Sequence, residues 1–190
     1  TRRSRVDALT QTIDAALGAM PGAPGLRLPG SLDAFELAVR AVLGQQVTVA
    51  AARTLARRLV ARFGQAESTP WPDVDRSFPA PPVLAQARVE QIAELGIIRT
   101  RAAALIALGQ AWPLLAEHFA GPASPERLIA ALCELPGIGP WTAHYIAMRA
   151  LRVPDAFPVG DVALRKAAGV TTDAQLLAHV EHARPWRAYA

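Results

Sequence analysis

Residues 135–145 read Leu-Pro-Gly-Ile-Gly-Pro-Trp-Thr-Ala-His-Tyr. Two glycines flanked by prolines are typical of a tight turn, and the apolar residues on either side recur at helical spacing. The stretch predicts two helices joined by a hairpin, in a motif that spans residues 124–151. Backbone N–H groups in such a turn, with the positive end of the second helix, can hold a phosphate. A bare Gly-x-Gly is more often an ordinary turn, but Pro140 at the first helical position and Thr142 just inside favour the anion site.

A second stretch, 157–165, reads Phe-Pro-Val-Gly-Asp-Val-Ala-Leu-Arg. It predicts Asp161 at the start of a further helix, where a negative charge is stabilised by the helix dipole. In isolation an aspartate in this position is an ordinary N-cap. Following an anion-binding hairpin so closely, it points to chemistry on a nucleotide.

Composition sets the class of protein. The chain has 190 residues, 52% of them hydrophobic and 19% charged, which fits one globular domain over residues 1–190 and excludes general disorder. A net charge of +4 and a pI near 10.2 favour a polyanionic partner. The single cysteine excludes an internal disulfide, a Cys-rich zinc site and a four-cysteine iron–sulfur site. No apolar run is long enough for a membrane span, so we expect a soluble, cytoplasmic protein without a membrane partner.

Apolar spacing at three and four residues throughout predicts an all-α fold of about eight to ten short helices. The chain starts without Met and stops inside an apparent helix, which suggests a piece of a longer protein. The predicted helices cover about 33–43, 47–63, 83–95, 100–119 and the stretch beginning at Ser124. Another helix begins at Thr172, and a proline-rich loop occupies 67–82.

The residues at 135–143, together with Gly160-Asp161, resemble the hairpin and the following aspartate of the helix-hairpin-helix DNA glycosylase superfamily. The upstream segment 40–49, Arg-Ala-Val-Leu-Gly-Gln-Gln-Val-Thr-Val, resembles its alkylation-repair branch, the 3-methyladenine DNA glycosylase II group. The resemblance covers about residues 30–190. It implies two helical lobes flanking a cleft. Relatives often also carry an N-terminal β-rich lobe before the first motif, and in this respect we expect the present sequence to differ from them.

The resemblance also implies roles for particular residues. Asp161 would be catalytic, and the N–H groups of Gly137, Gly139 and Thr142 would hold a DNA phosphate. No cofactor is expected for catalysis, but a structural Na⁺ or K⁺ would bind backbone carbonyls at the hairpin, namely those of Cys133, Leu135 and Ile138.

The position directly before Thr142 indicates the type of reaction. Members of the superfamily that also cleave the DNA strand carry a lysine there, and this chain has Trp141. Without that amine we expect monofunctional hydrolysis of the N-glycosidic bond, which leaves an abasic site. Trp141 and Tyr145, one helical turn apart, can line a pocket that stacks on a positively charged alkylated purine. Phe35, and less strongly Trp186, are further candidates for this pocket, although each also fits ordinary packing.

Gln45 and Gln46 lie between two predicted helices, where a side chain can enter DNA and fill the gap left by an extruded base. The resemblance gives Gln46 this wedge position, with Gln45 beside it. A polar cap between helices is the plainer alternative for both. The basic side chains of Arg53, Arg57 and Arg101 are weaker candidates for contacts to the DNA backbone.

The leading hypothesis is therefore a DNA repair enzyme of base excision repair: a monomeric glycosylase acting on 3-methyladenine and 7-methylguanine in double-stranded DNA, in the cytoplasm and at the nucleoid. One alternative with the same fold is a glycosylase for oxidised or mismatched bases. Another is a non-catalytic helix-hairpin-helix module that only docks DNA within a larger adaptive-response regulator.

Overall fold

The computed structural model describes residues 27–71, 74–120 and 124–189. Within these ranges all regular structure is helical, with one isolated antiparallel bridge between Ala66 and Arg76. The all-α prediction is confirmed for this part of the chain. None of the helices in these ranges combines the length and apolar character needed to cross a membrane.

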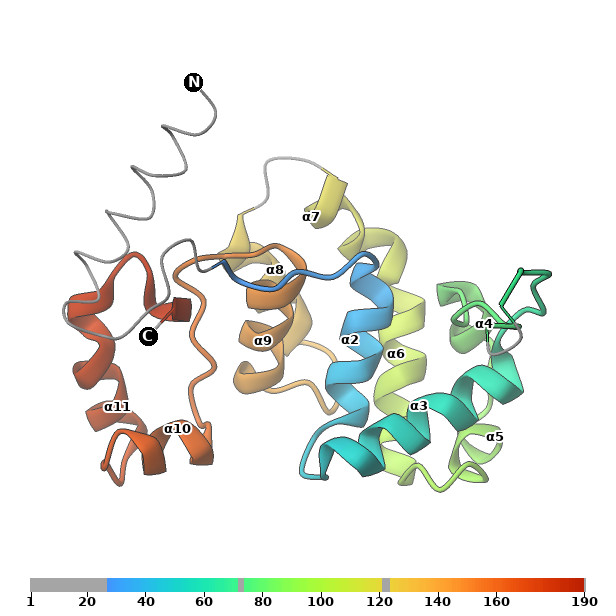
Figure 1. Cartoon of the computed structure of the whole chain (residues 1–190), viewed down its shortest axis with the longest axis horizontal. Helices are drawn as coiled ribbons and strands as arrows, with labels where there is room; N and C mark the ends of the chain where they lie inside the picture. The colour runs from blue at the N-terminus through green and yellow to red at the C-terminus, as the bar shows by residue number, and fades with distance from the viewer. Residues whose placement is uncertain (1–26, 72–73, 121–123, 190) are drawn as a thin grey trace.

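The larger group of helices surrounds one apolar core (Figure 1). In it α2 packs against α6 and α9, α8 pairs with α9, and α4 and α5 lie on α6. Residues such as Leu43, Leu105 and Ile146 are fully buried between these helices. The bounds are α2 (Ala34–Leu43), α3 (Val49–Phe63), α4 (Pro81–Ala85), α5 (Val89–Ala93), α6 (Arg99–Leu115), α7 (Glu117–Ala120), α8 (Pro125–Cys133) and α9 (Pro140–Ala150).

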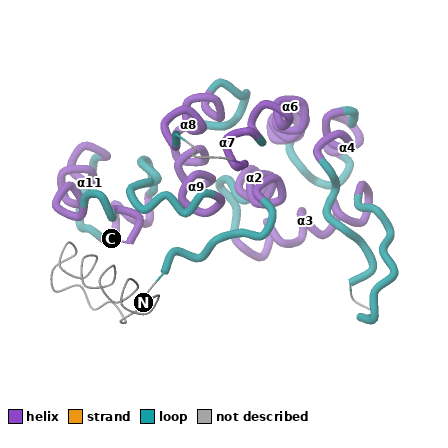
Figure 2. The backbone as a smooth tube through the Cα atoms, turned by 90° about the horizontal axis from the view of Figure 1, so that it is seen from above, coloured by secondary structure: helices purple, strands orange, loops and turns teal. Residues whose placement is uncertain are grey.

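A smaller group of helices follows α9 and has its own small core of Phe157, Leu176 and Val180. It lies on the left in Figure 1, and the same separation is visible from above in Figure 2. The group contains α10 (Val162–Ala167), α11 (Asp173–Val180) and two short 3₁₀ helices, η1 (Glu181–Ala183) and η2 (Arg187–Tyr189). The part of the chain that the structure describes thus forms two helical groups, joined by an irregular segment that runs from α9 to α10.

Several helices start at a residue whose side chain caps them. The side chains of Asp33, Thr48, Ser124 and Thr172 each accept a backbone N–H in the first turn of the helix that follows. At Asp33 the capping box is only half formed, because Glu36 pairs with Arg40 at 2.6 Å instead of returning to the cap.

Two predicted helices are interrupted. The predicted helix 83–95 is in fact α4 and α5, because the N–H of Arg88 leaves the helical pattern and donates to the side chain of Gln91 at 2.9 Å. The predicted helix 100–119 consists of α6, which ends at Leu115, and the short α7. The first break arises from local hydrogen bonding, which apolar periodicity does not report.

Candidate active site

The hairpin, residues 134–139, connects α8 to α9 at the place that the sequence predicts. Ile138 is buried and anchors it, and Gly137 adopts a positive φ of 78°. Gly139 is the N-cap of α9 with an ordinary φ of −91°, and a Cβ added there would meet no atom within 4 Å. Gly137 is therefore required by the backbone, whereas Gly139 leaves open space in front of the helix start.

The open space faces unused hydrogen-bond donors. Among the described residues, no acceptor pairs with the N–H groups of Gly137 and Gly139. The N–H of Thr142 belongs to the first turn of α9, where no intrahelical acceptor exists. Together with the positive end of an 11-residue helix, these groups can bind an anion.

Gln45 supports the hairpin from the neighbouring connection between α2 and α3. Its side-chain amide donates to the carbonyl oxygen of Gly137 and to Oγ1 of Thr142, both at 2.9 Å. The guanidinium of Arg101 donates to the Gln45 carbonyl. The wedge assignment of Gln45 is therefore wrong, because its polar end is already bound inside the protein.

Gln46 is placed differently from its neighbour. It is exposed, and its backbone adopts a positive φ of 53°. The connection that carries Gln46 lies on the lower side of the molecule in Figure 1, the side on which α10 also lies. Gln46 thus keeps the position of a candidate wedge.

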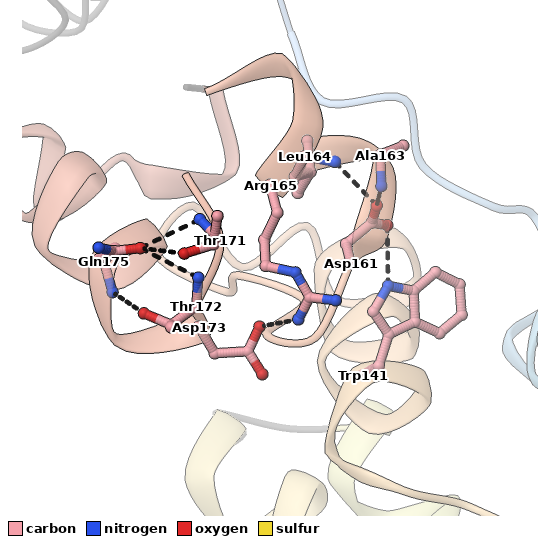
Figure 3. Close-up of polar contacts among 9 residues, drawn as sticks. All are labelled: Trp141, Asp161, Ala163, Leu164, Arg165, Thr171, Thr172, Asp173 and Gln175. Atoms are coloured by element: carbon pink, nitrogen blue, oxygen red, sulfur yellow. Dashed lines mark hydrogen bonds and ion pairs between the residues drawn. The ribbon is translucent and has the colours of Figure 1, made fainter. Parts of the chain in front are cut away.

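Asp161 is the N-cap of α10, and both of its carboxylate oxygens are engaged (Figure 3). Oδ1 accepts the N–H groups of Ala163 at 2.8 Å and Leu164 at 3.0 Å. Oδ2 accepts the indole Nε1–H of Trp141 at 2.9 Å. Three N–H donors and a helix start stabilise a negative charge here and hold the carboxylate in one orientation.

A cavity of about 270 Å³ lies in front of this carboxylate. α9 contributes one wall, and the other walls come from the segment before α10 and from η2. The lining residues are Trp141, Tyr145, Met148, Phe157, Pro158, Asp161, Leu164, Arg187 and Ala188. The structure therefore brings together three residues that the sequence singled out, Trp141, Tyr145 and Asp161.

The two aromatic side chains of α9 form a stack. The rings of Trp141 and Tyr145 lie 5.4 Å apart at an angle of 7°, and the guanidinium of Arg149 lies 5.8 Å from the Tyr145 ring centre. Trp141 precedes Tyr145 by one helical turn and Arg149 follows it by one turn, so they cover opposite faces of the Tyr145 ring. The Trp141 ring therefore has one face that neither Tyr145 nor Arg149 covers, and Trp141 is among the residues that line the cavity.

Two other aromatic candidates lie outside the cavity. Phe35 is buried in the main core with its ring edge-on to Trp112 at 4.9 Å, so its assignment to the base pocket is wrong. Trp186 packs against Ala183 and Tyr189 rather than lining the cavity. Lys166, which also does not line the cavity, is exposed in the last turn of α10.

Some of the lining residues that the sequence analysis did not single out are nevertheless indicated by their positions in the sequence. Met148 follows Trp141 by two helical turns and so shares its face. Phe157 and Pro158 lie in the stretch that leads to Asp161. Arg187 had no such signal, because it joins the cavity only through the packing of the chain's last segment.

A larger groove of about 560 Å³ lies between α2, α3 and the loop before α4. Four arginines line it, and one of them, Arg40, forms an ion pair with Glu36. Phe78 is the one aromatic side chain among its described lining residues. Among its described lining residues there is neither a carboxylate that caps the start of a helix nor a pair of stacked aromatic rings. The chemistry of the smaller cavity therefore makes it the stronger candidate for an active site.

The fold and this site define a helix-hairpin-helix protein with a carboxylate-bearing cavity next to the hairpin. The model of the HhH-GPD superfamily of base excision DNA repair proteins matches residues 39–171. The chain belongs to this superfamily.

Relatives with curated names lie in the branch that the sequence resembles. DNA-3-methyladenine glycosylase 2 of Escherichia coli is 39% identical over 181 residues, which are 95% of this chain and 64% of that protein. A probable bifunctional transcriptional activator/DNA repair enzyme of Mycobacterium tuberculosis is 38% identical over 97% of this chain and 39% of its own length. The chain thus spans less than two thirds of the length of each relative.

Among solved structures, the 3-methyladenine DNA glycosylase of Archaeoglobus fulgidus superposes with a TM-score of 0.73 at 22% identity. The match covers 94% of this chain and 61% of that one. This likeness confirms the predicted helix-hairpin-helix glycosylase fold.

Proposed function

We propose that the protein is a monofunctional DNA glycosylase that hydrolyses the N-glycosidic bond of alkylated purines, of the 3-methyladenine and 7-methylguanine type. The observation that carries the proposal is the carboxylate of Asp161. It is fixed by three N–H donors at the wall of a cavity large enough for a purine.

The carboxylate suits the charge that the reaction creates. Cleavage of an N-glycosidic bond builds positive charge on the sugar, which a fixed negative charge stabilises. The same oxygens can orient the attacking water. Because the two backbone donors and the indole hold Asp161 in place, little reorganisation is needed in the transition state.

The cavity suits a charged aromatic base. The free face of Trp141 can stack on an alkylated purine, and a cation–π contact contributes roughly 0.5–2 kcal/mol. A base that is already cationic is also a good leaving group, so a second acid to protonate it is not required. This matches the single carboxylate among the described lining residues.

Hydrolysis rather than strand cleavage follows from the residue before Thr142. Trp141 occupies that position, and it carries no amine that could form a Schiff base with the sugar. Lys166 is exposed and is not among the residues that line the cavity.

Double-stranded DNA is the partner that the hairpin and Gln46 favour. The N–H groups of Gly137, Gly139 and Thr142 would hold a phosphate, a contact that fixes register without reading bases. The exposed Gln46 would fill the space of the extruded nucleotide. We expect the protein to act as a monomer, in the cytoplasm and at the nucleoid.

The hairpin carbonyls also fit a structural Na⁺ or K⁺. Among the described residues no donor pairs with the carbonyls of Cys133 and Ile138, and that of Leu135 accepts one N–H, from Ile138 at 3.1 Å. Such oxygens suit a hard cation. When bound, the ion would add positive charge beside the phosphate.

The direct test is to incubate the protein with duplex DNA treated with a methylating agent and to identify the released bases by chromatography. We expect free 3-methyladenine and 7-methylguanine, with the phosphodiester chain uncut until the abasic sites are cleaved with alkali. Unmethylated duplex is the control. Release of no base at all would leave only a DNA-docking role, and release of oxidised bases alone would favour the other glycosylase class.

A further inference from the structure

One positive side chain stands in the wall of the candidate base cavity. Arg187, from η2, is the only basic residue among the described residues that line it, and its side chain is 11% exposed. A cationic base is the ligand that the proposed function requires. An unpaired guanidinium in this wall would repel it, so the charge of Arg187 must be offset.

Asp155 supplies the opposite charge. Its Oδ1 accepts a hydrogen bond from Nε–H of Arg187 at 2.7 Å, and its Oδ2 accepts one from Nη2–H of Arg187 at 2.8 Å. The same nitrogen donates to the Asp155 backbone carbonyl at 3.0 Å. This two-pronged pairing is the strong geometry for a guanidinium and a carboxylate.

The neighbouring charges complete a neutral network. Arg184 donates to Asp155 Oδ2 at 2.8 Å and pairs with Glu181 at 2.9 Å, so two arginines face two carboxylates. His144 lies nearby, and its pKa is lowered by burial and by the charge of Arg187, which keeps it neutral near neutral pH. Among the described residues that line the cavity, Asp161 is then the charged group that forms no ion pair with another described residue.

We propose that Asp155 is a specificity-determining residue: by neutralising Arg187 it gives the cavity its preference for a cationic base over a neutral base of the same shape. This inference rests on the proposed function. It is distinct from the catalytic role of Asp161, because Asp155 acts on the ligand through Arg187 and does not line the cavity itself.

The test compares two duplexes that differ in one charge. One carries 7-methylguanine on a 2′-fluoro sugar, which resists cleavage, and the other carries 7-deaza-7-methylguanine, which is neutral and has the same outline. Dissociation constants are measured by fluorescence anisotropy at slightly acidic pH, where 7-methylguanine is cationic. We expect the wild type to prefer the cationic base and Asp155→Asn to lower that preference at least tenfold. At an effective dielectric constant of about 20, an uncompensated charge within about 12 Å of the base costs about 1.4 kcal/mol or more, which is a factor of ten.

A second variant separates charge from structure. Asp155→Asn combined with Arg187→Gln removes both charges, and we expect it to restore the preference to within about twofold of the wild type. Asp173→Asn is the matched control, because it breaks the Arg165–Asp173 pair, whose residues do not line the cavity (Figure 3). It should leave the preference unchanged.

The outcomes distinguish this inference from the proposed function. If the wild type prefers the cationic base but Asp155→Asn keeps that preference, or weakens both duplexes equally, the inference is wrong and the proposed function stands. A double variant as impaired as the single one would also show a purely structural role. A wild type that binds both modified duplexes no better than undamaged DNA contradicts the inference and the proposed function together.

Discussion

The hydrogen bond between Trp141 and Asp161 gives one residue pair two tasks. The indole N–H orients the carboxylate at 2.9 Å, and the same bond fixes the plane of the ring that faces the cavity. Tyr145 stacks on the other side of that ring and so limits its motion. The carboxylate that we propose as catalytic and the ring that we propose to stack on the base therefore hold each other in place, which is the preorganisation that electrostatic catalysis requires.

His144 predicts a pH dependence of stability. Its Nδ1 is buried without a hydrogen-bond partner among the described residues, and burial and then Arg187 lower its pKa below the ordinary 6.5. Between pH 6.5 and the lowered pKa of the folded protein, His144 is protonated in the unfolded chain but not in the folded one. The free energy of unfolding therefore falls as the pH drops through this range. We expect the melting temperature to fall more between about pH 8 and about pH 5 in the wild type than in His144→Gln. Equal losses in the two proteins would contradict this.

At the scale of elements, the hairpin combines two glycines with different physical reasons. Gly137 has φ 78°, and a Cβ there would approach Cβ of Ala104 at 3.1 Å. Gly139 has neither constraint, so the folded protein itself has room for a side chain there. If a phosphate occupies the space beside Gly139, alanine at 137 should mainly affect folding and alanine at 139 should mainly affect DNA binding.

We expect Gly137→Ala to destabilise the protein by about 1–3 kcal/mol, the cost of a non-glycine residue in a sparsely populated region. Gly139→Ala should change stability by less than about 1 kcal/mol but weaken binding to every duplex similarly. Because one phosphate contact is lost, the slope of log affinity against log salt should also fall by about one. Thermal melts and salt titrations measure these effects. An unchanged salt slope in Gly139→Ala would contradict a phosphate contact at Gly139.

How much could be predicted from the sequence depended on whether a feature was local. The helix starts at Asp33, Ser124 and Thr172, and the position of Asp161 at the start of a helix, followed from short-range capping patterns. Phe35 was misassigned because periodicity gives the buried face of α2 but not the partner helix, which carries Trp112. Gln45 was misassigned because its contact, Gly137, lies far along the chain.

At the scale of the whole molecule, the cavity exists because the last described segment returns to α9. The N–H of Ala188 donates to the Pro154 carbonyl at 2.9 Å, and Arg187 is bound to Asp155. These contacts bring η2 to the segment between the two helical groups, opposite Trp141 and Tyr145. No single element contains the site, so its walls depend on both groups being folded.

Whether Asp161 is the catalytic residue is tested by the single-turnover rate at which Asp161→Asn releases 7-methylguanine from duplex DNA. Asparagine is also a good N-cap, so α10 should remain folded, and the binding of methylated duplex should change little. We predict that base release falls to the uncatalysed rate while the matched variant Asp173→Asn keeps wild-type activity. Release by Asp161→Asn at the wild-type rate, with binding and folding intact, would contradict the assignment of Asp161 as the catalytic residue.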